Sequence, residues 1–177
     1  MAGFNRIAMD LPEPNLTWAA GVLSAIELIS PESRRRIDCQ VYAVESMDVL
    51  DEMEELAVWM SDNGRVNGPG KVLIRLKWQN GRRFTKNTFQ AIFAHELGHA
   101  CSSPDEEAAC KAPSLAWAKE TVADRYVYKW DLAGLIKRNR KNGLSPSYRP
   151  GRQISDSGNT YLLNDAFDWV LIARGST

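Results

Sequence analysis

The sequence predicts an α+β fold in which a small, mostly antiparallel sheet packs against a helix over residues 87–101. Three observations lead to this prediction. Residues 37–44 and 71–78 alternate between apolar and polar side chains, which is typical of half-buried strands. Asn80-Gly81 follows the second of these segments and favours a hairpin turn. Longer segments carry apolar residues at helical spacing, and a chain of 177 residues has the length of one domain.

The individual elements follow from apolar spacing and capping residues, taken in chain order. We expect a single domain, 1–177, made of an irregular arm at 1–15, a core at 16–140 and a C-terminal loop and helix at 141–177. Helices are expected at 16–29, 47–60, 87–101, 114–140 and 164–173, and strands at 37–44 and 71–78. Ser30 can cap a short turn that begins at Pro31, and Asn87 and Ser114 can cap the helices that begin there. The charged outer face of the 71–78 strand indicates an edge strand.

Composition argues against several classes of partner. The 22 basic residues balance the 22 acidic ones, so we expect no binding to nucleic acid or to a membrane surface. No apolar run approaches the roughly 20 residues that span a bilayer. The first ten residues lack the basic flank and apolar core of a signal peptide, so we expect a cytoplasmic protein. In that compartment Cys101 and Cys110 are expected to be reduced rather than paired.

The candidate catalytic residues lie in one pentapeptide, His95-Glu96-Leu97-Gly98-His99, which contains both histidines of the chain. On a helix, positions i and i+4 lie on the same face, so both imidazoles can reach one zinc ion at roughly 2.0–2.1 Å. Glu96 lies beside them and can contact a water at the metal without binding the metal. The pentapeptide therefore predicts two zinc ligands and one general base.

A catalytic zinc commonly has three protein ligands and one open position, so a third ligand is expected. Glu120 is the first candidate, because Asp124 shares its helix face and can accept the free N–H of a ligating histidine. Asp105 is the alternative, because it lies six residues after His99, where metzincins place their third ligand. Two features count against Asp105: Ser102 stands where that pattern has a glycine, and no methionine follows residue 60 to form a Met-turn.

The segments His-Glu-Leu-Gly-His at 95–99 and Glu-Thr-Val-Ala-Asp at 120–124 together resemble the gluzincin clan of zinc metallopeptidases. The order of the expected elements is similar to the minimal gluzincin domain of ImmA/IrrE-type intracellular peptidases. The resemblance is specific over about 85–130 and architectural over 16–84. It implies a zincin-like fold, a Zn²⁺ cofactor, the ligands and base named above, and hydrolysis of a protein or peptide substrate. It also implies that the strand at 71–78 lines the cleft and pairs with extended substrate.

We therefore expect a zinc-dependent endopeptidase. Many gluzincins stabilise the oxyanion with a further histidine, but both histidines of this chain are assigned to the metal, so a tyrosine or arginine is expected instead. The candidates are Tyr126, Tyr128, Tyr148, Arg149, Arg152 and Tyr161. Two other functions stay open. One is a catalytically silent, regulatory or phage accessory module that binds a protein partner. The other is a structural zinc site with Cys101 as fourth ligand, which the scarcity of nearby His and Cys disfavours.

Overall fold

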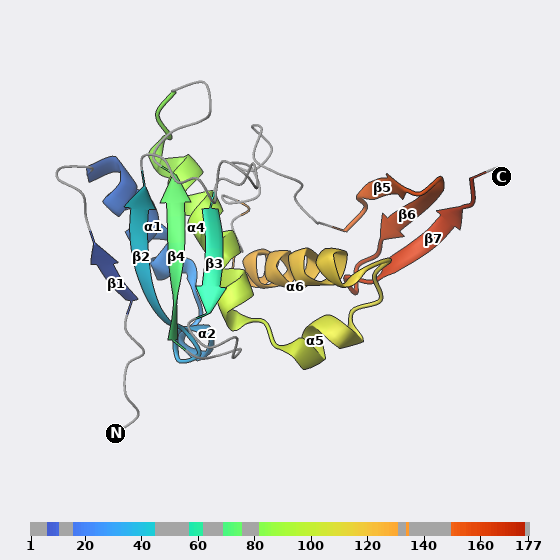
Figure 1. Ribbon diagram of the computed structural model, residues 1–177, viewed down its shortest axis with the longest axis horizontal. Coiled ribbons are helices and arrows are strands. Elements are labelled where there is room, and N and C mark those ends of the chain that lie inside the picture. Colours follow the sequence, from blue (N-terminus) through green and yellow to red (C-terminus); the bar gives the residue numbers. More distant parts are fainter. Residues whose placement is uncertain are drawn as a thin grey trace.

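The computed structural model describes residues 7–10, 16–44, 57–61, 69–75, 82–130, 134 and 150–175. These residues form a mixed α+β structure with two small sheets (Figure 1), which confirms the expected fold class at that level. The elements in chain order are β1 (Ile7–Asp10), α1 (Leu16–Leu28), α2 (Pro31–Arg34), β2 (Asp38–Val44), β3 (Ala57–Ser61), β4 (Pro69–Arg75), α4 (Lys86–Cys101), α5 (Pro104–Ala109), α6 (Leu115–Trp130), β5 (Gln153–Asp156), β6 (Asn159–Leu163) and β7 (Trp169–Ala173). Within the described part of the chain, no helix has the length and apolar character needed to cross a membrane.

The first sheet contains four strands in the order β1-β2-β4-β3. β1 and β4 both run parallel to β2, and β3 runs antiparallel to β4. The prediction of a mostly antiparallel sheet was therefore wrong for this sheet. The helices α1 and α2 connect β1 to β2, and such a helical crossover makes neighbouring strands parallel. The predicted hairpin at Asn80-Gly81 lies outside the described residues.

β4 is an interior strand of this sheet, and β3 forms one edge. The alternation over 71–78 correctly predicted a strand, but the edge position inferred from its charged outer face was wrong. Leu73 and Arg75, on the face that the sequence assigned to solvent, are buried. β3 lies where the sequence predicted the end of a helix over 47–60, so that part of the prediction was also wrong. The earlier part of the predicted helix lies outside the described residues.

Several local predictions are confirmed, but the irregular arm expected at 1–15 was wrong, because its residues 7–10 form β1 and pair with β2. α1 and β2 occupy the predicted segments, and the hydroxyl of Ser30 caps α2 by accepting a hydrogen bond of 3.2 Å from the Ser33 N–H. Ser114 caps α6 in the same way, because its hydroxyl accepts a 3.3 Å hydrogen bond from the Trp117 N–H. Of the predicted continuation of α6 to residue 140, the structure describes only Gly134 beyond Trp130.

α4 packs against α1, α6 and the side of the sheet formed by β3 and β4 (Figure 1). It begins after Thr85, whose hydroxyl accepts a hydrogen bond from the Thr88 N–H, so the cap predicted at Asn87 was wrong by two residues. One side of α4 carries apolar residues at helical spacing that are all buried, namely Phe89, Phe93, Leu97 and Ala100. Because α1, α6 and the sheet surround α4, most of its residues are buried and little of the helix is exposed to solvent.

The C-terminal residues form a second sheet of three antiparallel strands in the order β5-β6-β7. The helix predicted at 164–173 was therefore wrong, and within the described residues β5 and β6 stand in place of the predicted loop. Ser157 and Gly158 both have positive φ values, 50° and 80°, and join β5 to β6 in a two-residue turn that suits the twist of the strands. A small apolar core that includes Trp169 packs this sheet against Trp117 in the first turn of α6. The second sheet is thus attached to the beginning of α6 (Figure 1).

Candidate metal centre

The two histidines lie one turn apart on α4, on the same side of the helix. The Nε2 atoms of His95 and His99 are 3.1 Å apart, and the two rings meet at 89°. The two side chains are 13% and 18% exposed, although most of α4 is buried. The helix therefore presents two imidazole nitrogens to one point that solvent can reach.

α6 brings Glu120 to the same point. Its Oε2 atom lies 3.0 Å from His95 Nε2, and its Oε1 atom lies 3.3 Å from His99 Nε2. The ligand atoms of His95, His99 and Glu120 all lie within 4.8 Å of one another, so the three residues could hold a metal ion. Two imidazoles and one carboxylate form a donor set that catalytic zinc sites use, with a fourth position left open. The residues present therefore fit a zinc ion.

Asp124 lies behind His95, as the sequence predicted. Its Oδ1 atom is 2.8 Å from His95 Nδ1, and its side chain is only 3% exposed. A carboxylate in this place accepts a hydrogen bond from Nδ1–H, so Nε2 is the ring nitrogen that can bind a metal. The contact therefore orients the His95 ring with Nε2 toward Glu120 and His99.

The two imidazoles control the charge of Glu120. Burial alone would raise the pKa of its carboxyl, but hydrogen bonds from His95 and His99, together with the charges of these rings, lower that pKa well below its usual range. Glu120 is therefore ionised near neutral pH, which is the state that binds metal.

Glu96 is buried on α4 next to His95 and is 7% exposed. Within the described residues, its carboxylate has no hydrogen-bond or ion-pair partner. Glu96 thus directly follows His95 on α4, and its carboxylate is not used in a described hydrogen bond or ion pair. Such a carboxylate can interact with a water molecule or a ligand.

Asp105, the alternative third ligand, does not belong to the group. It lies in α5, a short helix that the sequence analysis missed, and its side chain is exposed. Ser103 caps α5 by accepting a hydrogen bond from the Glu106 N–H, while the Glu106 carboxylate accepts one from the Ser103 N–H. This capping box directs the chain away from α4 after the second histidine. The sequence contained its signal, a serine followed by proline and then by glutamate at the third position.

The three cysteines of the chain are unpaired. Cys101 is fully buried, and its thiol lies 3.8 Å from the carbonyl oxygen of Ser33. Burial raises the pKa of Cys101 to about 12, so it remains a thiol near neutral pH. Cys101 is absent from the group of described residues that could hold a metal, and the proposed fourth ligand is therefore not part of this centre.

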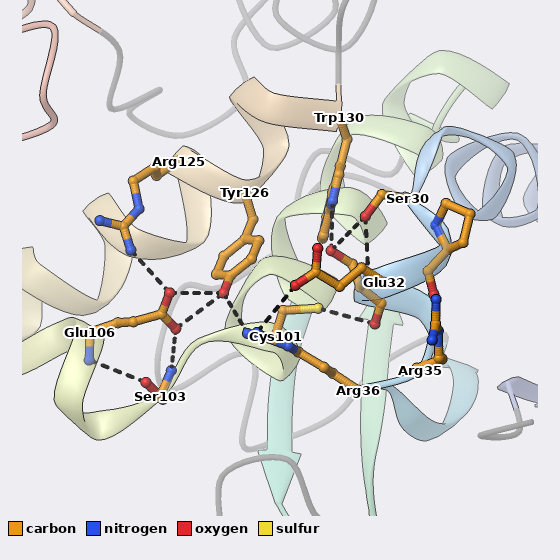
Figure 2. A network of polar contacts seen from close by, with 12 residues as sticks. Ser30, Glu32, Arg35, Arg36, Cys101, Ser103, Glu106, Arg125, Tyr126 and Trp130 are labelled. Atoms are coloured by element: carbon orange, nitrogen blue, oxygen red, sulfur yellow. Dashed lines mark hydrogen bonds and ion pairs between the residues drawn. The ribbon is translucent and has the colours of Figure 1, made fainter. Parts of the chain in front are cut away.

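Those tyrosines and arginines named as oxyanion donors that the structure describes are dispersed. Figure 2 shows the hydroxyl of Tyr126 in a polar network, where it donates to the Glu106 carboxylate at 2.9 Å and accepts from Arg36 at 3.0 Å. Burial, together with Glu106, raises the pKa of Tyr126 to about 12. Tyr128 packs on Phe167, and Tyr161 packs on Trp117. Arg152 precedes β5, and Tyr148 and Arg149 lie outside the described residues.

The sequence analysis missed two residues that make close contacts at the α6 turn carrying Glu120: Gly98 on α4 and Thr121 within the turn. Gly98 lies against the backbone of Ala123, and Thr121 accepts a 2.9 Å hydrogen bond from the indole N–H of Trp169. A glycine in a helix interior costs about 1 kcal/mol relative to alanine, which was a usable signal of close packing at Gly98. Nothing local in the sequence links Thr121 to a tryptophan in β7.

A scan against protein-family models and searches of curated proteins and of solved structures found no match to this chain. The function must therefore be inferred from the centre itself.

Proposed function

We propose that this protein is a zinc-dependent metallopeptidase with a zincin-like arrangement of the gluzincin type. His95, His99 and Glu120 would hold the zinc ion, and Glu96 would be the general base. The observation that carries this proposal is the convergence of three ligand atoms within 4.8 Å, with the Asp124 carboxylate 2.8 Å from His95 Nδ1. Structural zinc sites commonly use four Cys or His ligands, whereas a His₂Glu set leaves a position for water and substrate.

The chemistry that this assignment implies divides between the metal and the chain. A bound zinc ion supplies Lewis-acid activation of a water and of the scissile carbonyl. Glu96 takes a proton from the attacking water and passes it to the leaving amine nitrogen. Asp124 keeps the proton of His95 on Nδ1, and the partly exposed positions of the two histidines leave one side of the centre accessible to a peptide.

An extended peptide would pair with β3 rather than with β4, the strand that the sequence favoured. β2 and β4 pair along one edge of β4, and β3 pairs along the other, so β4 has no free edge for substrate. β3 is the terminal strand of the described sheet and packs against α4. Free backbone groups at a sheet edge bind extended peptides through main-chain hydrogen bonds. We therefore assign the substrate edge to β3.

The experiment that tests the proposal compares Glu96→Gln with Asp105→Asn. The chain, loaded with one equivalent of zinc, is incubated with a mixed peptide library and with denatured protein, and new amino termini are counted. We expect the wild type to hydrolyse peptides, and we expect a chelator to abolish this hydrolysis. In Glu96→Gln the rate of hydrolysis should fall on the order of 10²–10⁴-fold at unchanged zinc content. Asp105→Asn should retain the wild-type rate of hydrolysis, because Asp105 is exposed and lies outside the candidate centre.

Two results would contradict this proposal. Hydrolysis retained in Glu96→Gln would assign the proton transfer to another group. Zinc binding by the wild type without hydrolysis of any substrate would favour the catalytically silent module that binds a protein partner.

A cytoplasmic location remains part of the proposal, and the three unpaired cysteines are compatible with a reducing compartment.

A further inference from the structure

Gly98 allows α4 and α6 to meet backbone to backbone. A Cβ atom added at Gly98 would lie 2.5 Å from the carbonyl oxygen of Ala123, and 2.9 Å from its C and Cα atoms. Real Cβ atoms essentially never come closer than 3.0 Å to another heavy atom, and the atoms contacted here belong to the helix backbone, which cannot rotate away. The glycine therefore sets how closely the two helices approach.

This close contact lies in the same turn of α6 as the proposed carboxylate ligand. Ala123 immediately precedes Asp124 and follows Glu120 by three residues. To reach an ordinary contact of 3.4 Å instead of 2.5 Å, the Ala123 carbonyl would have to move by about 0.9 Å. Metal sites tolerate deviations of about 0.2 Å in ligand distance. A methyl group at Gly98 would therefore displace Glu120 further than a site shared with two histidines of α4 can accommodate.

The same turn is also held from the side of the second sheet. Thr121 is fully buried, and its hydroxyl oxygen accepts the indole N–H of Trp169 at 2.9 Å while donating to the Trp117 carbonyl at 2.6 Å. Trp169 is 6% exposed and belongs to the apolar core that joins the second sheet to α6. The turn 120–124 is thus fixed on one side by α4 and on another by β7.

We propose that Gly98 and Thr121 are positioning residues that hold Glu120 at metal-binding distance from the two histidines. In this account, the second sheet supports the centre through the hydrogen bond from Trp169 to Thr121. The inference rests on the proposed function only for the presence of the metal. It goes further by assigning a role to residues that do not touch the metal position.

The chain offers a matched control for Gly98→Ala. Gly21 of α1 also lies against α4, where an added Cβ would be 2.5 Å from Phe89 Cβ and 2.7 Å from the Lys86 carbonyl oxygen. Gly21→Ala thus creates an overlap of similar size on α4, but against α1 instead of α6. Zinc affinity is measured by competition with a chromophoric chelator, and folding is measured by circular dichroism and thermal melting. We expect both variants to melt at lower temperature, and only Gly98→Ala to bind zinc about 10–100-fold more weakly.

Thr121→Val and Thr121→Ser provide the second test, which also decides the matter if Gly98→Ala fails to fold. Valine removes the hydroxyl at nearly constant side-chain volume, and we expect the zinc affinity of Thr121→Val to fall about tenfold. Serine keeps the hydroxyl, so Thr121→Ser should bind zinc with nearly the affinity of the wild type. The proposal is overturned if folded Gly98→Ala binds zinc as Gly21→Ala does, or if Thr121→Val binds zinc as the wild type does. If the wild type itself binds no zinc, the proposed function fails, which is a separate result.

Discussion

Replacement of Asp124 by asparagine tests how the centre prepares its ligands. The carboxylate of Asp124 accepts a hydrogen bond from the Nδ1–H of His95 at 2.8 Å. Asparagine keeps the size of the side chain but removes its charge, so the amide oxygen is a weaker acceptor. The amide can also turn its NH₂ group toward the ring, which favours the tautomer with the proton on Nε2, the nitrogen that faces the other ligands. Asp124→Asn should therefore weaken metal binding without removing a ligand.

The size of the effect follows from the environment of the contact. Loss of a carboxylate that orients a ligating histidine costs about 10–100-fold in metal affinity. At about 1.4 kcal/mol per tenfold change, this corresponds to roughly 1.4–2.8 kcal/mol of binding free energy. Asp124 is only 3% exposed, so water cannot easily replace the lost acceptor. We therefore expect the loss of zinc-binding free energy to lie in the upper half of this range.

The assay is a competitive zinc titration against a chelator of known affinity at constant pH. Asp156→Asn is the control, because Asp156 is an exposed aspartate at the end of β5. We expect the control to match the wild type. If Asp124→Asn binds zinc as tightly as the wild type while remaining folded, the Asp124–His95 contact does not prepare a ligand, and the reasoning is refuted.

Three further predictions concern the remaining acidic and thiol groups. Glu120→Gln should lose stoichiometric zinc in a metal analysis, whereas Asp105→Asn should retain it; the opposite pattern would make Asp105 the third ligand. The lowered pKa of Glu120 stabilises the metal-free fold above its unfolded pKa of about 4.5, and this contribution is lost as the pH falls further. In urea unfolding of metal-free protein, the free energy of unfolding of the wild type should exceed that of Glu120→Gln at pH 6, and this difference should shrink toward pH 3. A difference that grows as the pH falls would contradict the prediction. Burial raises the pKa values of Cys39 and Cys101 to about 12, so both thiols should react with a disulfide reagent at neutral pH only after unfolding, and rapid labelling of either in the native protein would contradict their burial.

The candidate centre could be predicted from the sequence because its geometry is local to two helices. The spacing of His95 and His99 places both rings on one face of any α-helix, and Glu120 and Asp124 share a face in the same way. Their meeting is a tertiary contact, which the sequence indicated through the need for a third ligand near Asp124 and through the resemblance to gluzincins. The contact itself depends on Gly98, whose role is evident only when the Ala123 backbone is in place.

The strands were harder to predict because strand order depends on contacts between distant residues. The run over 57–61 is short and apolar, so it satisfies helix and strand spacing equally, and only pairing with β4 selects the strand. The C-terminal segment was assigned to a helix, although the β-branched Val170 and Ile172 and the glycine at 158 favoured strands and a turn. The parallel pairing of β1 with β2 and of β2 with β4 depends on which distant strands meet, and no local pattern along the chain specifies that choice.

The central claim is that His95, His99 and Glu120 bind one zinc ion. The most direct test is a crystal structure of the zinc-loaded chain, with anomalous diffraction recorded on both sides of the zinc absorption edge. The account predicts a single strong anomalous peak bonded to one nitrogen of each histidine and to Glu120, at about 2.0–2.2 Å. It also predicts Asp124 on His95 Nδ1 and an open fourth position beside Glu96. A peak bound by Asp105 or Cys101, or no peak between α4 and α6 in protein that contains zinc, would contradict the claim.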